Sequence, residues 1–137
     1  MGYTPAFFFD GDKVYMQGAA APGTNLFEIN LLTGEKISPE RTIWPGSGGL
    51  YPEGPHIYKR NERYYLMISE GDTHGNHMAT MACAKDTWGP YESCPKNSIL
   101  TARGKPSTYI PLGTATPLKT AKGGGGVSFL GAKRQHR

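Results

Sequence analysis

Hydrophobic residues in the first part of the chain fall into short runs that turn residues separate. Residues 6–9 and 13–17 flank an Asp-Gly-Asp tripeptide, which is the apolar–turn–apolar order of a β-hairpin. Residues 25–30 alternate apolar and polar positions, and residues 41–44, Arg-Thr-Ile-Trp, form the next strand candidate. This pattern predicts four antiparallel strands within about forty residues.

The same order recurs in the next part of the chain. An apolar run at residues 54–58 leads into a turn at 60–62 and a second run at 64–69. Residues 77–83 and 88–92 supply two more runs. We therefore expect a second four-stranded antiparallel unit, and no helix of more than two turns.

The spacing of these runs predicts an all-β antiparallel fold. The 19 glycines and 11 prolines favour many short strands joined by tight turns over long helices. Two successive four-stranded meanders are typical of consecutive blades of a β-propeller, although a β-sandwich produces short strands at the same spacing. The 137 residues are enough for one ordinary domain.

The strand pattern fails near residue 103. Residues 105–122 are rich in Pro, Thr and Lys, residues 123–126 are all glycine, and only residues 127–131 have the composition of a strand. We therefore divide the chain into a β-rich part, residues 1–103, and an irregular basic Gly-rich tail, residues 104–137.

The positive net charge belongs to this tail. Residues 1–100 hold eight Lys or Arg and eleven Asp or Glu, whereas residues 101–137 hold seven Lys or Arg and no acid. The basic residues are scattered without interleaved aromatics, so we expect no nucleic-acid partner. No apolar run reaches eighteen residues, so we expect no membrane partner either. The first residues lack the features of a secretion signal, which predicts a cytoplasmic protein, or a secreted one if the parent gene is longer.

The two cysteines and four histidines do not form a metal-binding pattern. Cys83 and Cys94 can pair across neighbouring strands, but we favour a chance pair of reduced thiols over a disulfide. The histidines are not spaced with cysteines as zinc ligands are. We expect no metal and no cofactor.

The candidate for chemistry is Glu53. It lies in the sequence Tyr-Pro-Glu-Gly-Pro-His at residues 51–56, directly before a predicted strand. A carboxylate between a proline and a glycine is held at a fixed angle on a turn, which is how a fold presents one acid to a ligand. The alternative is a turn carboxylate that caps nearby backbone amides.

Four stretches in fixed order, residues 4–15, 48–59, 64–73 and 88–101, resemble the glycosidases of glycoside hydrolase family 43. The resemblance covers about residues 3–103. It implies a five-bladed β-propeller, of which about two blades are present, and activity on xylose- or arabinose-containing glycans, as in β-xylosidases and α-L-arabinofuranosidases. It also implies an inverting mechanism with three carboxylates: an Asp base, a Glu acid and a second Asp that tunes the acid.

The resemblance assigns roles to individual residues. Glu53 occupies the position of the family's general acid, which needs a raised pKa and a rigid mount. Loops around the propeller pocket carry the substrate-binding candidates, for whose histidines a solvated loop is an equal alternative: Tyr51, Glu70, Thr73, His74 and His77.

The departures from the family pattern predict an incomplete site. Thr4 precedes Pro5 where the family has its tuning Asp, and threonine carries no charge that raises a neighbouring pKa. The family's Asp base lies in a blade upstream of these residues. In the tail, residues 113–118 and 123–126 replace a Gly-His-Ala-Asp-Leu motif and a Trp-Trp pair, which suggests a shift of reading frame.

Three functions stay open from the sequence. The first is a catalytically incomplete glycosidase fragment, the second is a fragment that binds glycans without cleaving them, and the third is a basic interaction module that acts through the tail. Because an unclosed propeller leaves sheet edges exposed, we also expect self-association.

Overall fold

The computed structural model describes residues 5–20, 22–71, 76–101, 109–119 and 125–133, with side chains described up to residue 101. Within these ranges every regular element is a β-strand and all strand pairs are antiparallel. The described part of the chain contains no helix that is long and apolar enough to cross a membrane.

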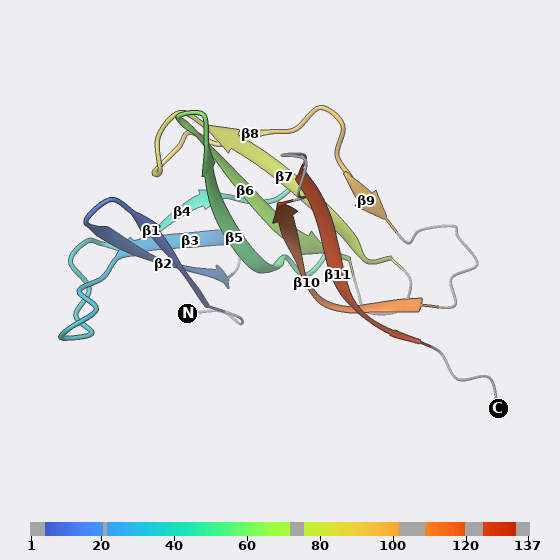
Figure 1. Ribbon diagram of the computed structural model, residues 1–137, viewed down its shortest axis with the longest axis horizontal. Coiled ribbons are helices and arrows are strands. Elements are labelled where there is room, and N and C mark those ends of the chain that lie inside the picture. Colours follow the sequence, from blue (N-terminus) through green and yellow to red (C-terminus); the bar gives the residue numbers. More distant parts are fainter. Residues whose placement is uncertain (1–4, 21, 72–75, 102–108, 120–124, 134–137) are drawn as a thin grey trace.

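The first sheet contains four strands in the order β1 (Ala6–Asp10), β2 (Lys13–Ala20), β3 (Gly23–Glu28) and β4 (Arg41–Trp44) (Figure 1). The β1–β2 hairpin turns at Gly11, whose φ of 63° lies in the region that glycine adopts without steric cost. The four strands predicted for this part of the chain are confirmed.

The second sheet contains β5 (Glu53–Arg60), β6 (Arg63–Glu70), β7 (Met78–Ala84) and β8 (Glu92–Ser93), and β9 (Leu100–Thr101) also pairs with β7. The strand predicted at residues 88–92 is wrong in extent, because only the last of these residues belongs to β8. Pro90 has no N–H for a ladder, and Gly89 has a φ of 91° that a strand does not use. Between β8 and β9, the Asn97 side chain exchanges two 2.9 Å hydrogen bonds with the backbone of Met81.

The two sheets pack against each other through one hydrophobic core. The first sheet contributes Phe8, Tyr15, Leu26 and Trp44, and the second contributes Ile57, Tyr64, Leu66, Ile68, Ala82, Ala84 and Tyr91. The residues at positions 64, 66 and 68 alternate along β6, so one face of that strand points toward the first sheet. The indole of Trp44 also donates a 3.1 Å hydrogen bond to Ser93 Oγ across the interface.

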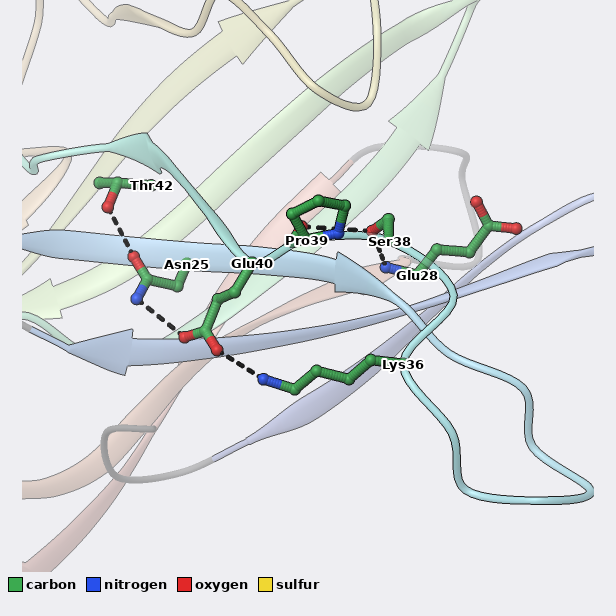
Figure 2. A network of polar contacts seen from close by, with 7 residues as sticks. All are labelled: Asn25, Glu28, Lys36, Ser38, Pro39, Glu40 and Thr42. Carbon is green, nitrogen blue, oxygen red and sulfur yellow. Dashed lines mark hydrogen bonds and ion pairs between the residues drawn. The ribbon is translucent and has the colours of Figure 1, made fainter.

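A polar network fastens the segment between β3 and β4 to β3 itself (Figure 2). Asn25 on β3 accepts a hydrogen bond from Thr42 at 2.8 Å and donates one to Glu40 at 3.0 Å. Lys36 reaches the other oxygen of Glu40 at 2.8 Å. These contacts hold the segment against β3 and lower the pKa of Glu40 through its hydrogen bonds to Lys36 and Asn25.

The last two strands, β10 (Tyr109–Lys119) and β11 (Gly125–Lys133), form a separate hairpin that lies beside β5 and β6 (Figure 1). The strand expected at residues 127–131 falls within β11, whereas β10 differs from the irregular structure expected there. Two prolines made that segment read as irregular, and the hairpin accommodates Pro111 next to a register shift in the pairing with β11. The proposed division at residue 103 stays a prediction.

Candidate active site

Glu53, Glu70 and His77 of the predicted site residues lie at one end of the second sheet, where β5 begins, β6 ends and β7 begins. Glu53, the first residue of β5, pairs with Ser69, and Ser69 pairs with Ala79. Glu70 follows Ser69, and His77 directly precedes β7. The strand pairing therefore places Glu53 at the same end of the second sheet as Glu70 and His77, although it lies well before them in the sequence.

A β-bulge sets the direction of Glu53. The pairing of β5 with β6 passes from Glu53↔Ser69 to His56↔Met67, so two residues of β5 oppose one residue of β6. Gly54 adopts a φ of 54° at this bulge, and Pro55 is fully buried. Bulges of this kind re-aim a side chain next to a binding site. The Glu53 side chain is exposed, as a proton donor to a bound ligand has to be.

Tyr51 lies two residues before Glu53 in a strained conformation. Its φ is 52°, and its side chain is 66% exposed. A bulky residue with positive φ is uncommon, and such strain persists only where neighbouring structure enforces it. The neighbouring Leu50 is also exposed, so apolar surface borders Glu53 on this side.

Glu70 is fully buried, and its carboxylate faces protein donors. It accepts hydrogen bonds from the Ser47 amide at 3.1 and 3.2 Å, the Ser47 hydroxyl at 2.6 Å and the Gly49 amide at 3.0 Å. The Thr80 hydroxyl donates a further short hydrogen bond. The loop between β4 and β5 therefore wraps around this carboxylate.

The connection between β6 and β7 carries the other predicted residues. His77 is buried at 4% exposure, next to the point where Gly71 packs on the backbone of Asn76. Thr73 and His74 lie outside the described residues, as does Thr4. No substrate contact of Tyr51, Glu70, Thr73, His74 or His77 is tested by the structure, and their roles stay predictions.

Burial changes the titration of two further side chains on β5. Burial lowers the pKa of His56, which therefore stays neutral at neutral pH, and raises the pKa of Tyr58 to about 12. The two rings lie 6.2 Å apart between centroids. His56 belongs to the motif that contains Glu53, and it adds an uncharged ring to the strand that presents the acid.

Sequence reasoning missed the partners of Glu70. Ser47, Gly49 and Thr80 carry no motif that points to a carboxylate, and they lie far from it in the sequence. The available signal was the Gly-Ser-Gly-Gly run at residues 46–49, since clustered glycines mark places where backbone approaches another group closely.

The arrangement supplies one exposed carboxylate for proton transfer. Within the described residues, the acidic side chains of the strands other than Glu53 and Glu70 lie toward the opposite end of the two sheets: Asp10, Glu28 and Glu92. Glu70 is occupied by protein donors. Among the described residues, this end of the second sheet therefore presents one exposed carboxylate, that of Glu53.

Comparison with known proteins shows which family and which proteins this chain is similar to. Residues 4–137 match the profile of Glycosyl hydrolases family 43. The chain is 35% identical over 119 residues to Xylosidase/arabinosidase 43B of Humicola insolens, a match that covers 80% of this chain and 22% of that protein. It is 37% identical over 112 residues to Xylan 1,3-beta-xylosidase of a Vibrio species, covering 74% of this chain and 21% of that protein.

Solved structures show the same fold. A family 43 protein from Bacillus licheniformis superposes with a TM-score of 0.81 at 34% identity, over 94% of this chain and 25% of that chain. The xylan beta-1,4-xylosidase of Bacillus halodurans superposes with a TM-score of 0.87 at 26% identity, over 98% of this chain and 28% of that chain. The chain thus spans about a fifth of the length of these curated relatives.

Proposed function

Because this chain belongs to glycosyl hydrolases family 43, we propose that it carries the acid-bearing part of a site that cleaves O-glycosidic bonds in xylose- or arabinose-containing glycans. The fold prediction is confirmed: the chain is an all-β antiparallel fragment of the family's five-bladed propeller, with the β1–β4 sheet and the β5–β9 sheet as its two blades. The observation that carries the proposal is the exposed Glu53 at the bulged start of β5.

In this proposal Glu53 is the general acid. Its carboxyl proton passes to the glycosidic oxygen as the bond from that oxygen to the anomeric carbon breaks, and the leaving sugar departs as a neutral alcohol. A second carboxylate, acting as base, removes a proton from the water that attacks the opposite face of the ring. Inverting enzymes hold the two carboxyl groups ~6.5–9.5 Å apart to leave room for this water.

Within the described residues, no carboxylate at this end of the second sheet is available for the base role in this proposal. Glu70 is buried and occupied by protein donors, and the sequence has Thr4 where the family has its tuning Asp. Without a base the attacking water is not activated. We therefore propose that the isolated chain binds sugar at this edge and does not turn it over.

The binding surface in this proposal is the apolar and polar border around Glu53. Tyr51 has an exposed aromatic ring, and aromatic rings provide flat apolar surface for the faces of sugars. Thr73, His74 and His77 belong to the β6–β7 connection that starts and ends at the same edge. We thus expect a carbohydrate to bind where the β4–β5 loop and the β6–β7 loop lie next to each other.

A glycan-binding fragment without catalysis is the second candidate. The exposure of Tyr51 and Leu50 favours it, since these apolar side chains border the site without any need for a second carboxylate. Both candidates predict sugar binding at the same edge. They differ in whether the chain cleaves a glycosidic bond once the other blades of the propeller are added.

Titration with xylobiose and with arabinobiose, followed by NMR of the 15N-labelled 137-residue chain, tests the binding site. We expect resonance shifts at Tyr51, Glu53 and His77, and none at the opposite end near Asp10. Purified segments that supply the other blades are then added with an aryl-xyloside or an aryl-arabinofuranoside. Turnover that Glu53→Gln abolishes supports the glycosidase, whereas binding without turnover supports the second candidate. Absence of any shift at this edge contradicts both.

A further inference from the structure

Glu70 is the most completely engaged buried carboxylate in the described part of the chain, and the proposed chemistry does not use it. Its donors come from the loop between β4 and β5 through Ser47 and Gly49, and from β7 through Thr80. Desolvating a carboxylate is costly unless such hydrogen bonds replace its water shell. The buried Glu70 carboxylate is therefore used to hold the loop between β4 and β5.

We propose that Glu70 is a positioning residue, which fixes the 46–50 loop and through it sets the placement of Tyr51 and Glu53. The inference rests on the proposed function in that Glu53 is taken as the acid. It does not require the isolated chain to turn over substrate, because the property in question is where the Glu53 carboxyl group lies.

The packing of the loop on Glu70 supports this role. A Cβ atom added to Gly46 would lie 2.6 Å from Glu70 Oε1, and one added to Gly49 would lie 2.8 Å from Glu70 Cβ and 2.5 Å from Met78 Cε. Gly46 also has a φ of 90°, which residues with a side chain rarely adopt. The loop is thus built to approach this one carboxylate closely.

The path from Glu70 to Glu53 is short and has little other support. The backbone N–H of Gly71, the next residue after Glu70, donates a 2.7 Å hydrogen bond to the carbonyl oxygen of Leu50. Leu50 and Tyr51 themselves are exposed, with 68% and 66% of their surface accessible, so side-chain packing does not hold them. Their placement, including the positive φ of Tyr51, depends on the anchored backbone on either side.

The register of β5 completes the connection. Glu53 pairs with Ser69, the residue before Glu70. The last two residues of β6 therefore hold both the 46–50 loop and the start of β5. A shift of the loop therefore changes the backbone that enters the bulge. Leu66 and Ala82 of the second sheet pack in the core that the two sheets share, so their amide exchange reports on the fold as a whole.

The test uses NMR of the 137-residue chain and its Glu70→Gln variant. The amide keeps the shape of the side chain but replaces one acceptor oxygen by a donor, which opposes the donors of Ser47 and Gly49. We expect hydrogen exchange of the Ser47 and Gly49 amides to accelerate by about tenfold or more, with Leu66 and Ala82 unchanged. We also expect the carboxyl 13C resonance of Glu53 to shift, which a merely structural role would not require.

Two variants keep the outcome interpretable. Glu40→Gln makes the same chemical change in the polar network beside β3, and we expect it to leave the Glu53 resonance unchanged. Ser47→Ala removes one hydroxyl donor and leaves the carboxylate in place, so it produces a smaller shift in the same direction even if Glu70→Gln unfolds. Faster loop exchange with an unchanged Glu53 resonance would overturn the proposal. Because no sugar is present, this result is independent of whether Glu53 acts on glycans.

Discussion

Lys59 Nζ lies 3.0 Å from Asp10 Oδ1, and this ion pair joins the end of β1 in the first blade to the end of β5 in the second. The other oxygen of Asp10 accepts hydrogen bonds from the Tyr64 hydroxyl at 2.5 Å and the Thr87 hydroxyl at 3.3 Å. One carboxylate thus connects the first blade to three segments of the second. The hydrogen bond to Tyr64, followed by that to Lys59, lowers the pKa of Asp10.

Asp10→Asn should destabilise the folded chain at neutral pH. The lowered pKa means that Asp10 contributes stability above its unfolded value of 3.8, and this contribution is lost as the pH falls through the folded value. We expect the free energy of unfolding at pH 7 to fall by about 1–2 kcal/mol. Urea unfolding at pH 7 and pH 3 should show the difference between wild type and variant shrinking at the lower pH. Asp12→Asn in the same turn is the control, and an equal loss there would contradict a specific role of Asp10.

His56 should make the stability of the folded chain sensitive to acid in a higher pH range than Asp10 does. Burial lowers its pKa below the ordinary value of 6.5, so the unfolded chain binds this proton more readily than the folded chain. Stability is therefore complete above about pH 6.5 and decreases as the pH falls through the folded value. We expect His56→Gln to reduce the change of the urea unfolding midpoint between pH 7 and pH 5. Asp10→Asn should leave the pH dependence of the midpoint unchanged in this range. An unchanged slope in His56→Gln would show that another group causes the loss.

The isolated chain should not hydrolyse aryl-xylosides or aryl-arabinofuranosides above background. Losing a general acid or base typically costs ~10²–10⁴-fold, and the chain has no candidate for the base among its described residues. Thr4→Asp restores the family residue at that position but supplies no base, so it should not restore turnover. The measurement is release of the chromophore over hours, compared with Glu53→Gln. Turnover that disappears specifically in Glu53→Gln would refute the proposed incompleteness.

The sequence predicts the positions of strands better than it predicts the contacts that loops make. The segment at residues 41–44 coincides with β4 because the β-branched and aromatic residues Thr42, Ile43 and Trp44 are a local strand signal. The same reasoning failed at Trp88, where Gly89 and Pro90 end any ladder, and at β10, where pairing with β11 organises a Pro-containing segment. Glu53 could be singled out from its Pro-Glu-Gly context, whereas the engagement of Glu70 depends on a loop more than twenty residues earlier. Such a contact is created by tertiary packing, which a local pattern does not contain.

The exposed face of β1 should drive self-association of the isolated chain. Phe7 and Phe9 are 50% and 61% exposed, while Phe8 between them packs in the core with its ring centroid 6.1 Å from that of Tyr64. Within the described sheet β1 is an edge strand that pairs only with β2, and an edge that also carries apolar side chains is a template for association.

Sedimentation equilibrium should therefore give a mass above the 14.9 kDa of one chain, rising with concentration. Phe7→Lys combined with Phe9→Lys should return the mass to that of the monomer, because two charges on this face oppose its burial against a second copy. Leu32→Lys is the matched control, since Leu32 is 97% exposed but lies beyond the end of β3, away from this edge. A wild-type chain that stays monomeric across the concentration range, or a Leu32→Lys variant that dissociates equally, would show that the β1 face does not form the contact.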